Sequence, residues 1–567
     1  MIRGIQKWRI AAVILFIAAG TGALAVRLFF LHLGGDGRLR QRVELLRRAE
    51  IELLPSRGRI LDRTGNVLAV NVAMKNVCAD PYVIARSGHS RFVAYHLARA
   101  LGLDPRSLVV RLQRPGRRFA YVKRRIPLEQ ADTIARMRLH GVFMEDTTAR
   151  YYPLGELMCH VLGFVNMEEK GCAGVELTYD RFLRGSGGLV VTQLDGRRRE
   201  LYHRRLVEMP PFEGMDVYLT LDMRAQYIVE EALRKALERY RARGAWAIVQ
   251  RVKTGEIVAL ASLPSFDLNR YRTASEEAML NRAIGYIYEP GSTFKVAVLA
   301  AALNEGVVTP EDVVDCEGGA WWYRGKVLHD HQAYDRLTVA DVLKKSSNIG
   351  AAKVALRLGE ERLARYLRGF NVGRRLGIDL PGEQAGILRE PDQWSAISAT
   401  RIAIGHEVGV TSLQMLNILC CIANKGLMLR PHVVSMVADT DGSVIYRAVP
   451  TVIGHPIDRD TAQVMLALLR RVTEAGGTGV KAAISGCPVA GKTGTAQKPI
   501  CGGYSRSDYI ASFVGVLPAD DPDLGIIVVV DTPQPLHAGG RVAAPVFAEI
   551  AQELLGVLDL GAGRGYL

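Results

Sequence analysis

The hydrophobic positions of this chain begin with one long run near the N-terminus. Apolar residues extend from Ile10 to Val26, and after a single Arg27 they continue to Leu33. A run of about 24 residues is long enough to cross the apolar core of a bilayer as a helix. We therefore expect a stub at 1–9 and a transmembrane anchor at 10–33.

Charges around this run favour one orientation. Arg3, Lys7 and Arg9 precede it, which favours a cytoplasmic N-terminus and a body outside the inner (cytoplasmic) membrane, in the periplasm or its equivalent. The arginine-rich segment at 38–48 weakens this argument, because flanking positive charges favour the cytoplasmic side. Long domains, however, cross the membrane largely regardless of such charges. A signal peptidase could instead cut after Ala23-Leu24-Ala25. We prefer a retained single-pass anchor, because the apolar run continues beyond that point.

Beyond the anchor, the pattern predicts an α+β protein. A mixed segment at 34–214 is followed by a larger domain at 215–558 and a tail at 559–567. In the larger domain we expect a mainly antiparallel sheet flanked by helices, and a helical subdomain, with a cleft between them. The expected helices are 223–240, 292–303, 339–345, 349–358 and 546–555, and the expected strands are 216–221, 245–249, 256–260, 489–496, 509–516 and 524–530.

The helix that begins near Ser292 carries candidate chemistry. Ser292-Thr293-Phe294-Lys295 is the only S-x-x-K in the chain, and the apolar run from Val296 to Leu303 predicts that the helix is buried. An i to i+3 step stacks Lys295 one turn above Ser292. Because desolvation favours the neutral amine, Lys295 is a candidate base for a serine nucleophile. Taken alone, the tetrapeptide is a weak signal and favours ordinary helix capping.

Two further motifs follow in order. Ser346-Ser347-Asn348 is the only S-x-N in the chain and falls in a turn between two expected helices, and Lys492-Thr493-Gly494-Thr495 follows a run of small residues. Small residues there leave room for a substrate to lie alongside as an extra strand. The order S-x-x-K, S-x-N, K-T-G is that of penicillin-recognising serine acyltransferases. A second K-T-G, Lys253-Thr254-Gly255, precedes the serine and is predicted to be a hairpin turn.

Composition excludes disorder and leaves the charge open to two interpretations. The chain is 49% hydrophobic and 23% charged, with a net charge of +15. The excess of positive charge indicates an anionic partner, such as lipid or a cell-wall polymer, or else a solvated arginine-rich surface. No zinc-finger spacing or basic-region heptad accompanies it, so we expect no nucleic-acid partner.

Cysteine and histidine spacing predicts no metal site and no cofactor. The eight cysteines form no C-x-x-C, and we expect most of them to be buried thiols. Cys487 and Cys501 flank the K-T-G strand and are the pair to test for a disulfide. The segment His329-Asp330-His331 has no third ligand nearby, and we expect a loop beside the cleft.

With these motifs, the chain resembles the class B penicillin-binding proteins over nearly everything after the anchor. The resemblance implies that 34–214 is an elongated, non-catalytic pedestal of the dimerisation type with mixed α/β structure, and that 215–558 is a penicillin-binding transpeptidase domain. The segments that carry it outside the catalytic motifs are 57–69 (RGRILDRTGNVLA), 150–153 (RYYP), 160–164 (HVLGF), 174–176 (GVE), 179–180 (YD), 183–185 (LRG) and 476–479 (GGTG).

The resemblance also implies the reaction, peptidoglycan D,D-transpeptidation. Ser292 attacks the carbonyl between the two terminal D-alanines of a donor stem peptide, and Lys295 takes its proton. Ser346 relays a proton toward the leaving amine, Asn348 holds the acyl-side amide, and Lys492 holds the network electrostatically.

The resemblance further implies that the K-T-G strand contacts the substrate. The hydroxyls of Thr493 and Thr495 meet the substrate carboxylate beside Gly494, and the backbone N–H groups of Ser292 and Thr495 form the oxyanion hole. An amine of a neighbouring stem peptide resolves the acyl-enzyme, and β-lactams trap it.

Among class B enzymes we favour the division-specific, septal type, because of the 164–166 and 171–176 segments and the compact length. An elongation or sporulation role is the alternative. A β-lactam sensor, a serine β-lactamase or a D,D-carboxypeptidase is disfavoured by the nine-residue stub and the long pedestal. The expected partners are stem peptides, β-lactams, the membrane, a polytopic glycan polymerase and other division proteins.

Overall fold

We describe the structure from a computed structural model. It describes residues 2–32, 41, 48–53, 55–114, 116–193, 201, 205 and 207–558. The expected tail at 559–567 and the end of the anchor at Leu33 lie outside these residues. The chain forms two compact units, one of residues 1–55 and 185–213 and the other of 56–184 and 214–567.

The first unit contains the expected membrane helix. Helix α1 spans Ile2–His32, and its section from Lys7 to His32 is long and apolar enough to cross a membrane, with a mean hydropathy of 2.1. It is the only such helix in the described part of the chain. A three-stranded antiparallel sheet of β1 (Arg48–Leu53), β6 (Gly188–Gln193) and β7 (Val207–Met209) completes the unit.

The second unit holds the rest of the pedestal and the catalytic domain, joined through one sheet. Strand β2 (Ile60–Leu61) pairs with β3 (Val67–Ala79) on one side and runs parallel to β8 (Asp216–Leu219) on the other. The sheet continues into β16 (Val434–Ala438) and β17 (Val444–Arg447) on the catalytic side. The boundary expected at 214/215 therefore stays a prediction, because both segments contribute strands to this sheet.

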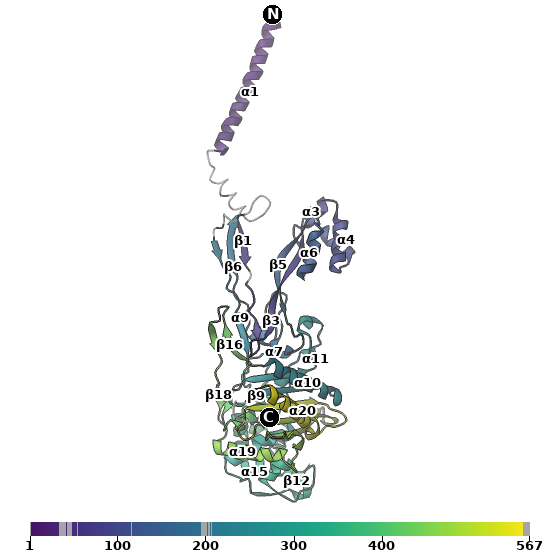
Figure 1. Cartoon of the computed structure of the whole chain (residues 1–567), viewed down its shortest axis with the longest axis vertical. Helices are drawn as coiled ribbons and strands as arrows, with labels where there is room; N and C mark the ends of the chain where they lie inside the picture. The colour runs from purple at the N-terminus through teal and green to yellow at the C-terminus, as the bar shows by residue number, and fades with distance from the viewer. Residues whose placement is uncertain are drawn as a thin grey trace. The chain divides into compact units, whose positions relative to one another are not determined.

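The far end of β3 leads to a small helical group. Strand β3 pairs with β4 (Ala120–Ile126) and β5 (Val142–Tyr151), and helices pack on them around a core of their own (Figure 1). These helices are α3 (Pro81–Arg86), α4 (Ser90–Leu101), α5 (Pro105–Leu112) and α6 (Leu128–Arg136). The shorter α7 (Cys159–Leu162), α8 (Gly174–Thr178) and α9 (Asp180–Leu183) follow β5.

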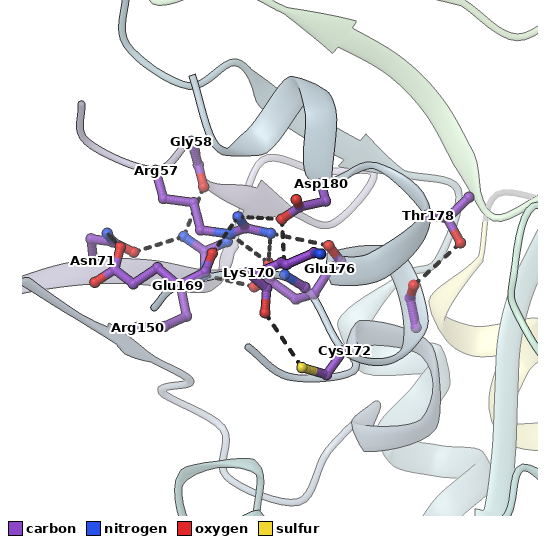
Figure 2. A network of polar contacts seen from close by, with 12 residues as sticks. Arg57, Gly58, Asn71, Arg150, Glu169, Lys170, Cys172, Glu176, Thr178 and Asp180 are labelled. Atoms are coloured by element: carbon purple, nitrogen blue, oxygen red, sulfur yellow. Dashed lines mark hydrogen bonds and ion pairs between the residues drawn. The ribbon is translucent and has the colours of Figure 1, made fainter. Parts of the chain in front are cut away.

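A buried charge network holds the base of the pedestal together (Figure 2). The Glu176 carboxylate, with 0% of its side chain exposed, accepts from Arg57 Nε at 2.8 Å and from Arg150 Nε at 2.6 Å. Arg57 also donates to Asp180 at 2.7 Å, and Arg150 to the carbonyl of Gly58 at 2.7 Å. These side chains come from segments the sequence marked as pedestal motifs, and their mutual pairing offsets the cost of removing each charge from water.

The catalytic domain is built on a five-stranded antiparallel sheet, in the order β10-β9-β21-β20-β19. Its strands are β9 (Gly244–Arg251), β10 (Ile257–Leu263), β19 (Ala490–Ile500), β20 (Gly503–Leu517) and β21 (Leu524–Asp531). Its covering helices and helical subdomain include α10 (Met223–Arg239), α13 (Lys295–Asn304), α14 (Val339–Lys345), α15 (Asn348–Leu358), α16 (Glu360–Gly369), α18 (Ser412–Ala423), α19 (Arg459–Thr473) and α20 (Gly539–Val557).

Both faces of this sheet are buried, which the near-continuous apolar strands dictate. Along β9, Ala245 and Ala247 face the cluster that includes α10 and α20, and Trp246 and Ile248 face the main core with α18. The Trp246 indole donates to Ser412 of α18 at 2.7 Å. A strand with period 2 and helices on both sides has no polar face, so alternation is absent from its sequence.

The last helix begins earlier than the sequence predicts, so the expectation of 546–555 is wrong at its start. Helix α20 begins at Gly539 and contains Pro545. Proline removes the hydrogen bond to the carbonyl four residues before it, that of Arg541. The hydroxyl of Tyr240 donates to that carbonyl at 3.3 Å, so a side chain distant in sequence compensates for the lost bond.

All eight cysteines are free thiols in the structure. Cys487 is buried beside the sheet and Cys501 is exposed in the turn between β19 and β20. The expectation that most cysteines are buried is confirmed, and the pair singled out for a disulfide is not bonded.

Replacing Glu176 by alanine should destabilise the second unit strongly. The change leaves the buried Arg150 without its carboxylate and Arg57 with Asp180 alone, and breaking a buried ion pair typically costs about 3–5 kcal/mol. We expect a clear fall in the urea concentration of the first unfolding transition of the detergent-solubilised protein. The matched control is Lys253→Ala, which breaks the exposed pair with Asp521 at 2.8 Å and should cost less than about 1 kcal/mol. Equal midpoints for the two variants would contradict the assigned role of the network.

Candidate active site

Ser292 lies where a short turn enters a buried helix. Residues Gly291–Phe294 form a 3-10 turn that leads into α13, and Ser292 is half-buried whereas residues 295–302 of the helix behind it are buried. No hydrogen bond involves the Ser292 hydroxyl within the described residues. The expected helix is present, but the serine precedes its first regular turn.

Glycines bring this turn against the K-T-G strand. A Cβ on Gly291, which has φ +58°, would come within 2.9 Å of the carbonyl oxygen of Thr495. A Cβ on Gly494 would come within 2.9 Å of the methyl group of Thr293. Any larger residue at either position would separate the two backbones, so the close approach requires glycine.

Lys295 is completely buried and bonded to the S-x-N turn. Its amine lies 2.7 Å from the carbonyl oxygen of Ser346, 2.7 Å from Oδ1 of Asn348 and 3.3 Å from the Ser346 hydroxyl. The lysine is thus held by the second motif rather than by Ser292, with which it makes no hydrogen bond. That arrangement fixes the amine in one position beneath the 3-10 turn.

Lys492 approaches the same hydroxyl from the sheet. Its amine lies 2.9 Å from Ser346 Oγ and 3.1 Å from the carbonyl oxygen of Thr493, and its side chain is fully buried. Ser346 ends α14 in the left-handed conformation, with φ 61°, which turns its side chain between the two lysines. One hydroxyl therefore joins all three sequence motifs.

Burial lowers the pKa values of both lysines. For Lys295, desolvation outweighs the opposing attraction of Asp330 and lowers the pKa to about 7. The pKa of Lys492 is also well below its usual range, first through burial and second through repulsion by the charge on Lys295. Two amines that share one hydroxyl cannot both be charged at low cost, so at least one of them is neutral near pH 7.

Asp330 is a structural part of the site that the sequence did not identify. Its carboxylate accepts from the Ser347 hydroxyl at 2.6 Å, from the backbone N–H of Asn348, and from that of Ile349 at 3.1 Å. The adjacent carbonyl of His329 accepts from the Asn348 side chain at 2.8 Å. The segment was expected as a loop beside the cleft, but no local pattern indicated that it caps α15 and fixes the S-x-N turn.

The K-T-G strand presents an open edge. Strand β19 is the last in the sheet order, and among the described residues it pairs only with β20. The Thr493 hydroxyl donates to Thr478, from the G-G-T-G segment, at 2.9 Å, and the Thr495 hydroxyl accepts from the N–H of Gly539 at 2.9 Å. Because it accepts that bond, the Thr495 hydroxyl keeps its own proton for donation.

The second K-T-G is the hairpin turn that the sequence predicts. Residues 253–255 lie between β9 and β10, which pair in antiparallel fashion. The Lys253 side chain is 55% exposed and ion-paired with Asp521, whereas Lys492 is 0% exposed. The described residues contain no group of three metal-ligating side chains that could hold a metal ion.

Known proteins share both domains of the chain. The model of the penicillin binding protein transpeptidase domain matches residues 245–552, and that of the penicillin-binding protein dimerisation domain matches 52–219. Peptidoglycan D,D-transpeptidase FtsI of Escherichia coli is 33% identical, covering 89% of this chain and 84% of that protein. Stage V sporulation protein D of Bacillus subtilis is also 33% identical, covering 88% and 78%.

Solved structures agree with this relationship. Penicillin binding protein 3 of Mycobacterium tuberculosis, complexed with aztreonam, has a TM-score of 0.71 at 27% identity, covering 91% of this chain and 99% of that one. A peptidoglycan synthetase from Bifidobacterium adolescentis has a TM-score of 0.73 at 26% identity, covering 91% and 98%. With a transpeptidase domain over more than half its length and a dimerisation domain ahead of it, the chain belongs to the penicillin-binding proteins, as a serine-type transpeptidase of class B.

Proposed function

We propose that this protein cross-links the stem peptides of peptidoglycan through an acyl-enzyme at Ser292, and that it does so during septal wall synthesis. The observation that carries the chemistry is the convergence of two buried lysine amines on Ser346 Oγ, at 3.3 Å and 2.9 Å, beneath the turn that bears Ser292. Such an arrangement serves proton transfer between a serine nucleophile and a leaving amine.

In the first half-reaction, Lys295 is the base. Its neutral amine has two N–H groups, which the 2.7 Å contacts with Ser346 O and Asn348 Oδ1 occupy. The lone pair is then left to accept a proton. It takes the proton of Ser292 as Oγ attacks the carbonyl between the two terminal D-alanines, and the tetrahedral intermediate forms.

Collapse of that intermediate needs a proton on the leaving nitrogen. Ser346 donates this proton, and the terminal D-alanine departs as the free amine. The Ser346 hydroxyl is then reprotonated from the lysine network. The carboxylate of the bound donor lies beside Thr493 and Thr495, and its negative charge raises the pKa of the nearby Lys492. Lys492 is thereby charged when substrate is present, in agreement with its electrostatic role.

Backbone groups stabilise the oxyanion. The N–H groups of Ser292 and Thr495 belong to two segments that the contact between Gly291 and Thr495 holds together. A pair of such donors contributes about 3–4 kcal/mol per donor in comparable enzymes. The donor stem peptide lies along β19 beside Gly494, and Asn348 holds the amide on the acyl side of that peptide. An acceptor amine then attacks the ester and restores Ser292.

The septal role rests on the sequence features at 164–166 and 171–176 and on the compact length of the chain. One similar protein is named for sporulation, so a sporulation role is the first alternative to the septal role. An elongation role is the second alternative. We further propose a polytopic glycan polymerase as membrane partner, because a monofunctional transpeptidase needs glycan strands to cross-link. We also propose that the N-terminus of α1 is cytoplasmic.

Loss of the nucleophile should abolish covalent labelling. Ser292→Ala should form no adduct with fluorescent penicillin, and Lys492→Ala should acylate about 10²–10³-fold more slowly, the usual contribution of one electrostatic group in an active site. Lys253→Ala, in the other K-T-G, is the matched control and should acylate normally. Full labelling of Ser292→Ala would refute the assignment, and rapid turnover of penicillin by the wild type would favour a hydrolase.

Acylation should depend on pH near neutrality. Because the pKa of Lys295 is about 7, its amine is protonated and inactive as a base below that value and neutral above it. The acylation rate constant should therefore rise from about pH 6 to about pH 8 and then level off. Lys295→Arg should be slow at every pH, since the guanidinium stays charged. A flat wild-type profile across this range would exclude Lys295 as the base.

Depletion of the protein in its host tests the biological role. Filaments blocked at septation are the expected result, and a tagged copy from the same cells should co-purify in mild detergent with a polytopic glycan polymerase. Rounded cells that still divide would assign the protein to elongation. Normal vegetative growth with failed spores would assign it to sporulation, and repeated recovery without a polymerase would contradict the partner.

A further inference from the structure

One exposed aromatic surface lies directly beside the S-x-N turn. Strands β12 (Ala320–Tyr323) and β13 (Lys326–His329) form a two-stranded hairpin in the helical subdomain (Figure 1). Trp322 on this hairpin is 69% exposed, and its cross-strand partner Val327 is 39% exposed. An uncovered tryptophan in a well-defined strand is unusual, because its burial would stabilise the fold substantially.

The inner face of the hairpin packs against the helical subdomain. Its inner face carries Trp321, Tyr323 and Leu328, and Leu328 belongs to a small core with Ile349 of α15. The rings of Trp321 and Tyr323 lie 4.7 Å apart, and the Lys353 amine of α15 lies 5.2 Å from the Trp321 ring centre. Trp321 on the inner face packs against this core, whereas most of Trp322 stays exposed.

The outer face is continuous with the active site. Side chains directly opposite or two residues apart share one face of a hairpin, so Trp322, Val327 and His329 form one strip. The carbonyl of His329 accepts from the Asn348 side chain, and the next residue, Asp330, holds the S-x-N turn. The strip therefore begins at the group that orients the donor peptide, and it extends about 7 Å along the strand to Val327.

The chemistry of the donor indicates what reaches this strip. The stem peptide separates the reacting D-alanine from the sugar that carries it, and each extended residue of that peptide spans about 3.3–3.6 Å. A stem peptide whose acyl-side amide lies at Asn348 would place its sugar beyond that group, and the hairpin strip is a surface that continues from Asn348 through His329. The C–H face of a pyranose ring is apolar and flat, and it matches an indole, while the exposed Arg324 of the adjacent turn offers N–H donors to hydroxyl and acetamido oxygens.

We propose that the outer face of the β12–β13 hairpin, centred on Trp322, binds an N-acetylhexosamine of the donor glycan strand. This inference rests on the proposed transpeptidation and names a subsite for the same substrate. The hairpin lets the enzyme distinguish stems attached to a glycan from free peptide, because the sugar contact adds to the peptide contacts at Asn348 and β19. Trp322 positions the donor and takes no part in the bond changes at Ser292.

Competition against labelling of Ser292 tests the proposal with the full-length protein in mild detergent. Acylation by fluorescent penicillin is timed in the presence of a disaccharide-pentapeptide or of the same pentapeptide without sugars. For the wild type, the sugar-bearing competitor should protect Ser292 better. Trp322→Ala should weaken that protection about tenfold, the scale of losing one aromatic contact, while protection by the bare peptide stays unchanged. Trp322→Tyr should retain most of it.

The controls separate this inference from the proposed function. Phe92→Ala removes another exposed aromatic residue, on α4, and should alter neither competitor. The labelling rate without competitor should be equal in all of these variants and serves as the measure of folding. Equal protection by the two competitors in the wild type, or an unchanged difference in Trp322→Ala, would overturn the glycan subsite. An equal loss for both competitors would overturn it too, by assigning Trp322 to the peptide. Absence of labelling in the wild type would instead refute the proposed function.

Discussion

Two lysine side chains buried against one hydroxyl are the constraint on which the catalytic domain depends. Lys295 and Lys492 come from a helix and a sheet strand almost 200 residues apart in sequence, and both are fully removed from water. Burying an ammonium group without a counter-ion is costly, so the domain keeps at least one amine neutral near pH 7. The same low pKa that reduces the cost of burial provides a base.

The surrounding structure holds that arrangement in place. Ser346 adopts a left-handed backbone conformation to place its hydroxyl between the amines, and Asp330 fixes the next three residues by capping α15. Gly291 and Gly494 permit the helix turn and the strand to approach. Each of these features is individually unfavourable or restrictive, and they are found together because proton transfer requires fixed donors and acceptors.

Sequence reasoning predicted much of this, where the signal was local. The S-x-x-K helix, the turn between α14 and α15, the β9–β10 hairpin and the strands of the C-terminal part follow from apolar periodicity and turn residues. The structure brings Lys295, Ser346, Asn348 and Lys492 together as the motif order implied. Their roles in the reaction stay predictions.

What the sequence could not provide depends on contacts between distant segments. The role of Asp330 rests on three hydrogen bonds to residues 17 to 19 positions later in the chain. The sequence of the 329–331 segment does not predict these bonds. The early start of α20 depends on Tyr240, about 300 residues away, which binds the carbonyl that Pro545 leaves free. The two K-T-G copies make the same point: the tripeptide is identical, but one lysine is exposed in a turn and the other is buried at the edge of a sheet. Whether a motif forms an active site depends on how deeply the surrounding elements bury its side chains. Sequence alone predicts that burial only where the residues that cause it lie nearby in the chain.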